Sequence, residues 1–173
     1  MTSPTDILKF WRLPPQGLNS IGASACVGLI AVALFMQYMM ELNPCYLCIV
    51  QRVFVITTGF ILLIASLHNP GRGGQRVYAL FGALSAVSGA GFSIRQLWLQ
   101  SLPEDKVPAC GPSADYLFDS LPLRDALSML LRGDGNCAEV QWALLDLSIP
   151  AWTLLAFTGL ALLCIWQGLR RDY

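Results

Sequence analysis

Four apolar stretches, each about 20 residues long, constrain the fold of this chain more than any other feature of its sequence. They cover about residues 21–40, 46–67, 77–98 and 149–168. An α-helix of that length and composition spans the hydrocarbon core of a bilayer. The chain as a whole is 55% apolar and 13% charged, which is more hydrophobic than a typical soluble domain. The sequence therefore predicts an all-α membrane protein built as a four-transmembrane-helix bundle.

The stretch between the third and fourth apolar runs, about residues 99–148, is polar enough to form a long loop outside the membrane. Apolar residues recur there at helical spacing between Pro122 and Gly133, which predicts a short amphipathic helix over residues 123–131. Beside a bilayer we expect that helix to lie flat on the headgroups. No convincing cleavage site follows the first apolar run, so we expect a retained helix and one integral membrane domain over residues 1–173.

Basic residues are unevenly divided between the two sides of the predicted bundle. Six of them flank helix ends on the side of both termini, namely Lys9, Arg12, Arg72, Arg76, Arg170 and Arg171. The loop on the other side carries Lys106, Arg124 and Arg132 together with eight acidic residues. The positive-inside rule therefore places both termini in the cytoplasm and the loop outside it. The net formal charge is zero, which gives no reason to expect a nucleic acid as a partner of this bilayer protein.

The six cysteines divide along the same line. Four fall on the outer side, namely Cys45, Cys48, Cys110 and Cys137. Disulfides persist outside the cytoplasm and are rare within it, so two outer pairs, one of them at a helix start, describe a disulfide relay. Cys26 and Cys164 fall toward the cytoplasmic ends of their helices, where we expect reduced, structural thiols.

The start of the second apolar run places two thiols and a cation at the mouth of a membrane helix. Asn43 is a favoured N-cap and Pro44 a favoured first helical residue, so we expect Cys45 in the first turn. There the helix dipole and the unpaired N–H groups would lower the pKa of its thiol. Cys48 follows one turn later, close enough for a small reactive disulfide, and Arg52 lies one turn beyond it as a second functional candidate.

Plainer interpretations of these residues stay open at this point. Arg52 can snorkel to the headgroups, while Cys45 and Cys48 can be small buried hydrophobes or half of a zinc site, since a lone C-x-x-C is a weak motif. Arg95, beside a tryptophan at the far end of the third run, is either an interfacial anchor or a group near a bound anion.

Several motifs, taken together, resemble those of the disulfide bond formation protein B (DsbB) family, the membrane oxidants of the periplasmic thiol oxidoreductase DsbA. They are Pro44-Cys45-x-x-Cys48-x-x-x-Arg52, the loop pair Cys110 and Cys137, and Cys137-Ala138-Glu139-x-Gln141-Trp142 leading into Ile149-Pro150-x-Trp152. With the four helices, these motifs cover nearly the whole chain. The resemblance implies a multi-pass protein of the bacterial inner membrane with its redox cysteines on the periplasmic side.

By this resemblance the chain is a quinone-dependent protein-disulfide oxidoreductase that reoxidises a DsbA-type partner. The reduced partner would attack the loop disulfide Cys110–Cys137, with Cys110 forming the mixed disulfide. Cys137 would then attack Cys45, and Cys48, released as a thiolate, would pass two electrons to a membrane quinone. Either ubiquinone or menaquinone fits this scheme.

The resemblance also implies residues that bind the quinone. Arg52 can stabilise negative charge on the thiolate and on the quinone, and Arg95 is a second candidate. Better-known relatives place a histidine near the quinone, where the matching stretch of this chain has Gln96. The protonation route of the quinone is therefore open in this sequence.

Two other functions fit parts of the pattern. An enzyme akin to vitamin K epoxide reductase is also a helical bundle with a C-x-x-C, but we would expect that motif late in the chain rather than at the second helix. A metal carrier that uses four thiolates would bind zinc or copper and oxidise no thiols. No histidine or acidic ligand stands beside Cys45 and Cys48, which argues against the carrier.

Overall fold

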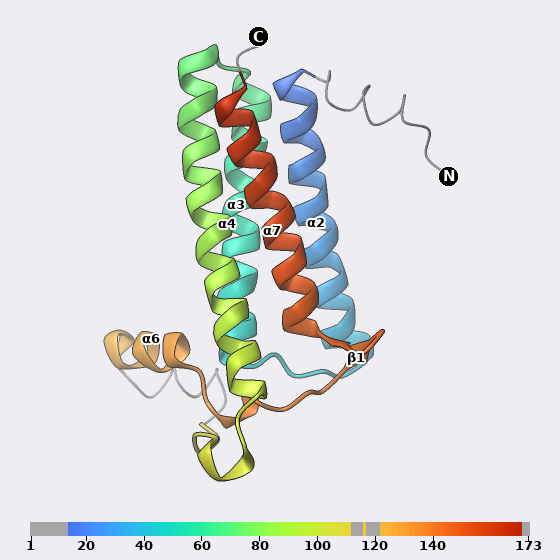
Figure 1. Ribbon diagram of the computed structural model, residues 1–173, viewed down its shortest axis with the longest axis vertical. Helices are drawn as coiled ribbons and strands as arrows, with labels where there is room; N and C mark the ends of the chain where they lie inside the picture. Colours follow the sequence, from blue (N-terminus) through green and yellow to red (C-terminus); the bar gives the residue numbers. More distant parts are fainter. Residues whose placement is uncertain (1–13, 112–115, 117–121, 171–173) are drawn as a thin grey trace.

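The computed structural model describes residues 14–111, 116 and 122–170. In this part of the chain, four long helices stand side by side as an up-and-down bundle (Figure 1). They are α2 (Pro15–Met39), α3 (Tyr46–His68), α4 (Arg72–Gln100) and α7 (Ile149–Leu169). Each is long and apolar enough to cross a membrane, and less than a third of its most apolar stretch is buried inside the bundle. The predicted all-α membrane bundle is confirmed, whereas Lys9, Arg12 and Arg171 lie outside the described residues.

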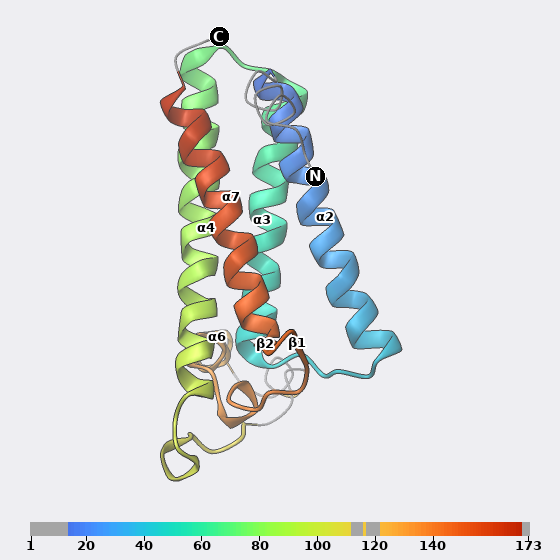
Figure 2. The same cartoon turned by 45° about the vertical axis from the view of Figure 1, so that its right-hand side comes forward.

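The four helices form an incomplete ring. α7 packs along α4, α4 along α3 and α3 along α2, whereas α7 and α2 meet at only a few residues. In Figure 2, α2 stands at one edge of the bundle next to α3. The side of the bundle between α2 and α7 is therefore less tightly closed than the other three sides.

α2 begins earlier than its hydropathy predicts, at Pro15 rather than at residue 21. Asn19 interrupts the apolar pattern, but it is buried, and its amide donates to Gln75 Oε1 on α4 at 3.2 Å. Gln75 in turn donates to Gln167 Oε1 on α7 at 2.7 Å. Buried amides that find partners on neighbouring helices are stable there, and hydropathy alone cannot show that pairing.

α4 also exceeds its predicted bounds, since it starts at Arg72 rather than at residue 77 and ends at Gln100. The link between the second and third predicted runs, residues 68–76, is thereby reduced to the few residues around Asn69, which takes a left-handed backbone with φ of 43° and closes α3. Asn tolerates that conformation better than most residues. The bounds of α3 and α7 agree with the predicted runs to within one residue at each end.

Cys26 and Cys164 lie in the apolar core between the helices and carry free thiols. A Cβ on Gly59 would lie 2.7 Å from Cys26 Cβ, and a Cβ on Gly82 would lie 2.9 Å from Cys164 Sγ. Both thiols therefore fill space against a glycine on a neighbouring helix. This is the packing of small buried hydrophobes.

The loop between α4 and α7 folds against the end of the bundle where α3 begins. Its elements are η1 (Glu104–Lys106), α6 (Leu123–Arg132), η2 (Gly135–Cys137), β1 (Ala143–Leu144) and β2 (Leu147–Ser148). The amphipathic helix predicted over residues 123–131 is confirmed as α6, which lies crosswise to the long helices (Figure 1). Its Ala126 and Leu130 pack in one apolar cluster with Leu47 of α3 and Leu99 of α4.

A two-stranded hairpin that the sequence analysis did not predict leads into α7. Its turn residues Leu145 and Asp146 have φ of 55° and 60°. A two-residue hairpin turn needs such positive φ values so that its backbone matches the twist of the strands. The hydroxyl of Ser148 donates to Gln100 Oε1 at 2.8 Å, and the indole of Trp152 donates to the Leu144 carbonyl at 3.2 Å. The first bond holds the start of α7 against the end of α4, and the second holds the hairpin against α7.

Candidate active site

The N-cap of α3 is Cys45, not Asn43 as the sequence predicts. Cys45 has an extended backbone, with φ of −70° and ψ of 169°, and Tyr46 is the first helical residue. Asn43 and Pro44 lie in the link from α2, and no side chain of the N-cap makes a capping hydrogen bond. Cys48 rather than Cys45 is therefore the cysteine in the first turn of α3.

Sulfur atoms take the place of a polar cap at this helix start. The backbone N–H of Leu47 donates to Cys137 Sγ, and that of Cys45 donates to Cys48 Sγ. The first N–H groups of a helix have no partner within it and carry partial positive charge, so they suit a sulfur that becomes an anion. The site for negative charge exists as predicted, but Cys48 and Cys137 occupy it.

Three of the four predicted redox cysteines meet here. Cys45 Sγ and Cys48 Sγ are 2.7 Å apart, and Cys137 hydrogen-bonds to Cys45. All three are free thiols; Cys137 is fully buried, Cys45 is 8% exposed and Cys48 is partly exposed. Cys45 thus lies between the other two sulfurs, which is the order that successive thiol–disulfide exchange needs.

The pKa values of Cys45 and Cys137, which lie outside the membrane-spanning segments, are shifted in opposite directions. Hydrogen bonds to Cys137 and then Cys48, followed by burial, raise the pKa of Cys45 above its ordinary value. The same bond with Cys45, followed by the Leu47 N–H, lowers the pKa of Cys137 although burial opposes it. The prediction of a lowered pKa for Cys45 is wrong, because the hydrogen bonds to Cys137 and Cys48 and the burial of the thiol raise its pKa instead. The lowered pKa belongs to Cys137.

Cys110 is exposed, and its segment lies beside that of Cys137. The Gly135 N–H donates to the Ala109 carbonyl at 3.3 Å, and a Cβ on Gly135 would lie 3.0 Å from Cys110 Sγ. The buried carboxylate of Asp134 accepts from the Gly111 N–H at 2.9 Å and from Cys137 Sγ at 3.4 Å. Asp134 therefore joins the backbone that follows one loop cysteine to the thiol of the other.

Gln96 of α4 lies behind the C-x-x-C pair and is only 3% exposed. Its Nε2 lies 3.2 Å from Cys45 Sγ and 3.4 Å from Cys48 Sγ, and its Oε1 lies 3.7 Å from Cys48 Sγ. The amide of Gln51 donates to Gln96 Oε1 at 2.7 Å, and the hydroxyl of Thr153 donates to Gln51 Oε1 at 2.8 Å. A chain of hydrogen bonds thus runs from both sulfurs through three helices.

The two predicted arginines lie in different surroundings. Arg52, one turn below Cys48, is held by α2, where its guanidinium donates to Gln37 Oε1 and, at 3.0 Å, to the Ala33 carbonyl. Arg95 is exposed, stacks 4.8 Å over the Trp98 ring and lies 3.5 Å from the Arg132 carbonyl at the end of α6. Arg52 therefore stays close to the C-x-x-C pair, while Arg95 faces α6.

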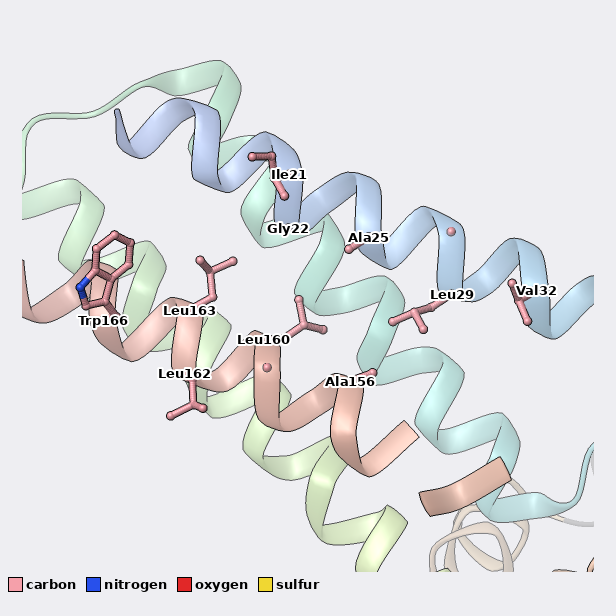
Figure 3. A pocket seen from close by; sticks show the side chains of 12 residues that line it. Ile21, Gly22, Ala25, Leu29, Val32, Ala156, Leu160, Leu162, Leu163 and Trp166 are labelled. Atoms are coloured by element: carbon pink, nitrogen blue, oxygen red, sulfur yellow. The ribbon is translucent and has the colours of Figure 1, made fainter. Parts of the chain in front are cut away.

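An apolar groove of about 800 Å³ runs between α2 and α7, where the helix ring is incomplete (Figure 3). Ile21 and Trp166 line one end of it, and Val32 and Ala156 line the other. Val32 is followed in the chain by Ala33, whose carbonyl accepts from Arg52. The groove therefore leads along the membrane-spanning helices toward the arginine below Cys48. The sequence analysis did not predict this groove, because it depends on how α2 and α7 pack.

Four membrane-spanning helices with a cluster of thiols at the start of one of them define a disulfide oxidoreductase of the membrane. The profile of the family described as disulfide bond formation protein DsbB matches residues 15–167. The chain therefore belongs to the DsbB family. A relative from Saccharophagus degradans, named Disulfide bond formation protein B, is 56% identical over 165 residues, or 95% of this chain and 99% of the relative.

A second relative with the same name, from Stutzerimonas stutzeri, is 48% identical over 158 residues, or 91% of this chain and 97% of the relative. These matches confirm the resemblance on which the sequence analysis rests. They identify the chain as a thiol oxidase and do not favour the epoxide reductase or the metal carrier.

Proposed function

We propose that this protein reoxidises a periplasmic DsbA-type thiol oxidoreductase and passes the electrons to a membrane quinone. The observation that carries the proposal is the arrangement of the three sulfurs, in which Cys137 contacts Cys45 and Cys45 contacts Cys48. Cys110, exposed beside the segment of Cys137, is the point of entry for a partner in solution.

The first exchange takes place in the loop. A thiolate of the partner attacks Cys110 Sγ in the Cys110–Cys137 disulfide, a mixed disulfide forms, and Cys137 leaves as a thiolate. The Leu47 N–H and Cys45 stabilise that thiolate, as the lowered pKa of Cys137 indicates. The partner's second thiolate then attacks the mixed disulfide, so that the partner leaves oxidised and Cys110 becomes a thiolate.

The second exchange carries the electrons to the membrane helix. Cys137 attacks Cys45 Sγ, the Cys45–Cys48 bond breaks, and Cys48 is released as a thiolate in the first turn of α3. The Cys110 thiolate then attacks Cys137, which restores the loop disulfide and frees Cys45. The net result is that two electrons and two protons from the partner rest on Cys45 and Cys48.

The residues around Cys48 fit a quinone. Arg52 has five N–H donors, and its bonds to Gln37 and Ala33 use two of them, so donors remain for a carbonyl oxygen. The groove between α2 and α7 is apolar and offers about 800 Å³ for an isoprenoid tail. When bound there, a quinone supplies the acceptor for the two electrons and two protons that return Cys45 and Cys48 to a disulfide. We propose no contact of Arg95 with it, because that side chain faces α6.

The bundle has a proposed orientation as well. Arg72, Arg76 and Arg170 lie at the end of the bundle opposite the cysteines, so the positive-inside rule puts that end in the cytoplasm and the cysteines in the periplasm of a bacterial inner membrane. In intact cells a membrane-impermeant maleimide should label reduced Cys110 and should not label a Gly73→Cys variant at its introduced thiol. The reverse pattern would invert the orientation.

The proposed activity is tested by following quinone reduction optically. Purified protein in detergent is mixed with a reduced DsbA-type partner and a soluble ubiquinone or menaquinone analogue. We expect partner-dependent reduction that Cys48→Ser abolishes and that Cys164→Ala, which alters a remote buried thiol, leaves at the wild-type rate. A wild-type protein that reduces neither quinone, or a Cys48→Ser variant that still does, contradicts the proposal.

A further inference from the structure

We propose that Thr153 of α7 is a positioning residue for the C-x-x-C pair. Its hydroxyl bonds to Gln51, Pro150 and Ser93 and acts on the cysteines only through Gln51 and Gln96. Its hydroxyl decides which end of the Gln96 amide faces Cys45 and Cys48. This inference rests on the proposed function only in that it assigns the Cys45–Cys48 pair a redox cycle. The effect itself concerns the thiol–disulfide equilibrium of that pair.

The amide group of Gln96 can face the sulfurs in two ways. A glutamine side chain carries a donor end and an acceptor end, and a half-turn of the amide exchanges them. In this structure the donor Nε2 of Gln96 faces the two sulfurs, at 3.2 and 3.4 Å. A donor in that place stabilises a thiolate, whereas the amide oxygen would repel it.

Gln51 holds Gln96 in that orientation. Because Gln51 Nε2 donates to Gln96 Oε1 at 2.7 Å, the oxygen of Gln96 points away from Cys45 and its nitrogen toward it. Gln51 is itself an amide that can turn over, so its own orientation needs a cause. Both side chains are 3% exposed, so water does not compete for their polar atoms.

Thr153 supplies that cause. Its hydroxyl lies 2.8 Å from Gln51 Oε1 and 3.0 Å from the Pro150 carbonyl, and it has one proton to give. When the proton goes to Gln51, the Gln51 oxygen faces Thr153 and the nitrogen faces Gln96. When it goes to Pro150, the hydroxyl can only accept from Gln51, and both amides have to turn over. The hydroxyl of Ser93 on α4 lies 3.2 Å from that of Thr153 and hydrogen-bonds to it.

The hydrogen bonds from Thr153 through Gln51 to Gln96 can therefore all donate in one direction or all in the other. The direction in this structure points the Gln96 donor at the sulfurs and favours the reduced pair. Reduction by two glutathione thiols breaks the Cys45–Cys48 bond, leaves two electrons on the two sulfurs and forms glutathione disulfide. Donation from Gln96 stabilises the sulfur that carries negative charge afterwards. Loss of the Thr153 hydroxyl lets both polarities mix and weakens that donation.

The test measures this equilibrium directly in the full-length protein. Purified variants in detergent are equilibrated in glutathione buffers, quenched in acid and alkylated, and the oxidised fraction of the peptide that contains Cys45 and Cys48 is read by mass spectrometry. Thr153→Val keeps the shape and removes the hydroxyl. We expect it to shift the equilibrium severalfold toward the disulfide, up to about the tenfold that complete loss of a hydrogen bond to a charged group gives. For a two-electron couple that upper limit is about 30 mV.

Three further variants make the result specific. Thr153→Ser keeps the hydroxyl and should restore the wild-type equilibrium. Thr158→Val removes an exposed hydroxyl one turn further along α7, which bonds only its own helix at Leu154, and should change nothing. Gln51→Glu leaves only acceptors on the side chain that now donates to Gln96, so the Gln96 amide has to turn over and the shift should exceed that of Thr153→Val.

An equilibrium within twofold of wild type in Thr153→Val would overturn the inference, as would an equal shift in Thr158→Val. If Thr153→Val does not purify as a folded protein, Thr153→Ala, which also removes the hydroxyl, decides the question by the same criterion. The measurement needs neither partner nor quinone. A wild-type protein that fails to reduce quinone therefore contradicts the proposed function and leaves this result unaffected.

Discussion

The pKa values of Cys45 and Cys137 depend first on hydrogen bonds to neighbouring sulfurs, and for Cys137 backbone N–H groups add to that effect. Cys137 comes from a distant loop, yet it accepts the Leu47 N–H of α3, and Cys48 accepts the N–H of Cys45. Cys45 lies between them, and its hydrogen bonds to the two neighbouring sulfurs raise its pKa. In the proposed relay, Cys45 is therefore the sulfur that receives attack from Cys137.

The first prediction concerns the pKa of Cys137. The hydrogen bond with Cys45 is the largest cause of the lowered pKa of Cys137. Cys45→Ala should therefore raise that pKa back toward the ordinary thiol value of 9.0. At neutral pH the thiolate fraction then falls, and alkylation of reduced Cys137 should slow and reach its plateau only at higher pH. Mass spectrometry of the Cys137 peptide across a pH series measures this. An unchanged pH midpoint would show that the bond does not set the pKa.

The second prediction concerns Asp134, which ties Gly111 to Cys137. Asp134→Ala removes the acceptor that holds the Gly111 N–H next to Cys110, so the effective concentration of Cys110 at Cys137 should fall about tenfold. Glutathione buffers measure this as a loop disulfide that is about tenfold easier to reduce. Asp134→Asn keeps an acceptor for the Gly111 N–H and should stay close to wild type, as should Asp125→Ala on the exposed face of α6.

At the scale of helices, apolar runs and motif spacing predict the four spans, α6 and the end of the bundle that holds the cysteines. They do not predict that α2 starts at Pro15, since the cost of burying Asn19 is offset by Gln75 and Gln167, which lie far away in the sequence. The hydrogen bonds that join Gln96, Gln51 and Thr153 cannot be predicted from the sequence for the same reason. Each of its members is an ordinary polar residue until three helices are packed together.

Helix spacing in this bundle depends on a few glycines, and α4 gives a matched pair for a test. A Cβ on Gly89 would lie 2.3 Å from the Phe157 ring, which is fully buried, whereas a Cβ on Gly91 meets nothing within 4 Å. Gly89→Ala should lower the free energy of unfolding in detergent by about 1–3 kcal/mol through overpacking. Gly91→Ala should be neutral or slightly stabilising, because alanine favours helix. Equal stability of the two variants would mean that the ring moves aside freely.

On the scale of the whole molecule, the groove between α2 and α7, where we propose that the quinone tail binds, is separate from the cysteines. Gly159 lines the groove, and no atom lies within 4 Å of a Cβ placed there. Gly159→Phe should fill the groove and raise KM for a long-tailed quinone severalfold, with little change for a tail-less analogue. Leu155→Phe, on an exposed position of α7 outside the groove lining, is the control. An equal effect on both quinones would place the tail elsewhere.

The incomplete ring of helices also has a kinetic meaning. In the proposed reaction, Cys110 would meet its partner in the aqueous phase, while the groove for the quinone tail opens to the side, into the plane of the lipid. The two substrates therefore arrive from reservoirs of different dimension, and the concentration that matters for one is molecules per litre and for the other molecules per lipid. Adding more lipid to a fixed amount of enzyme and quinone dilutes one substrate and leaves the other untouched. A single turnover thus couples events counted in three dimensions to events counted in two.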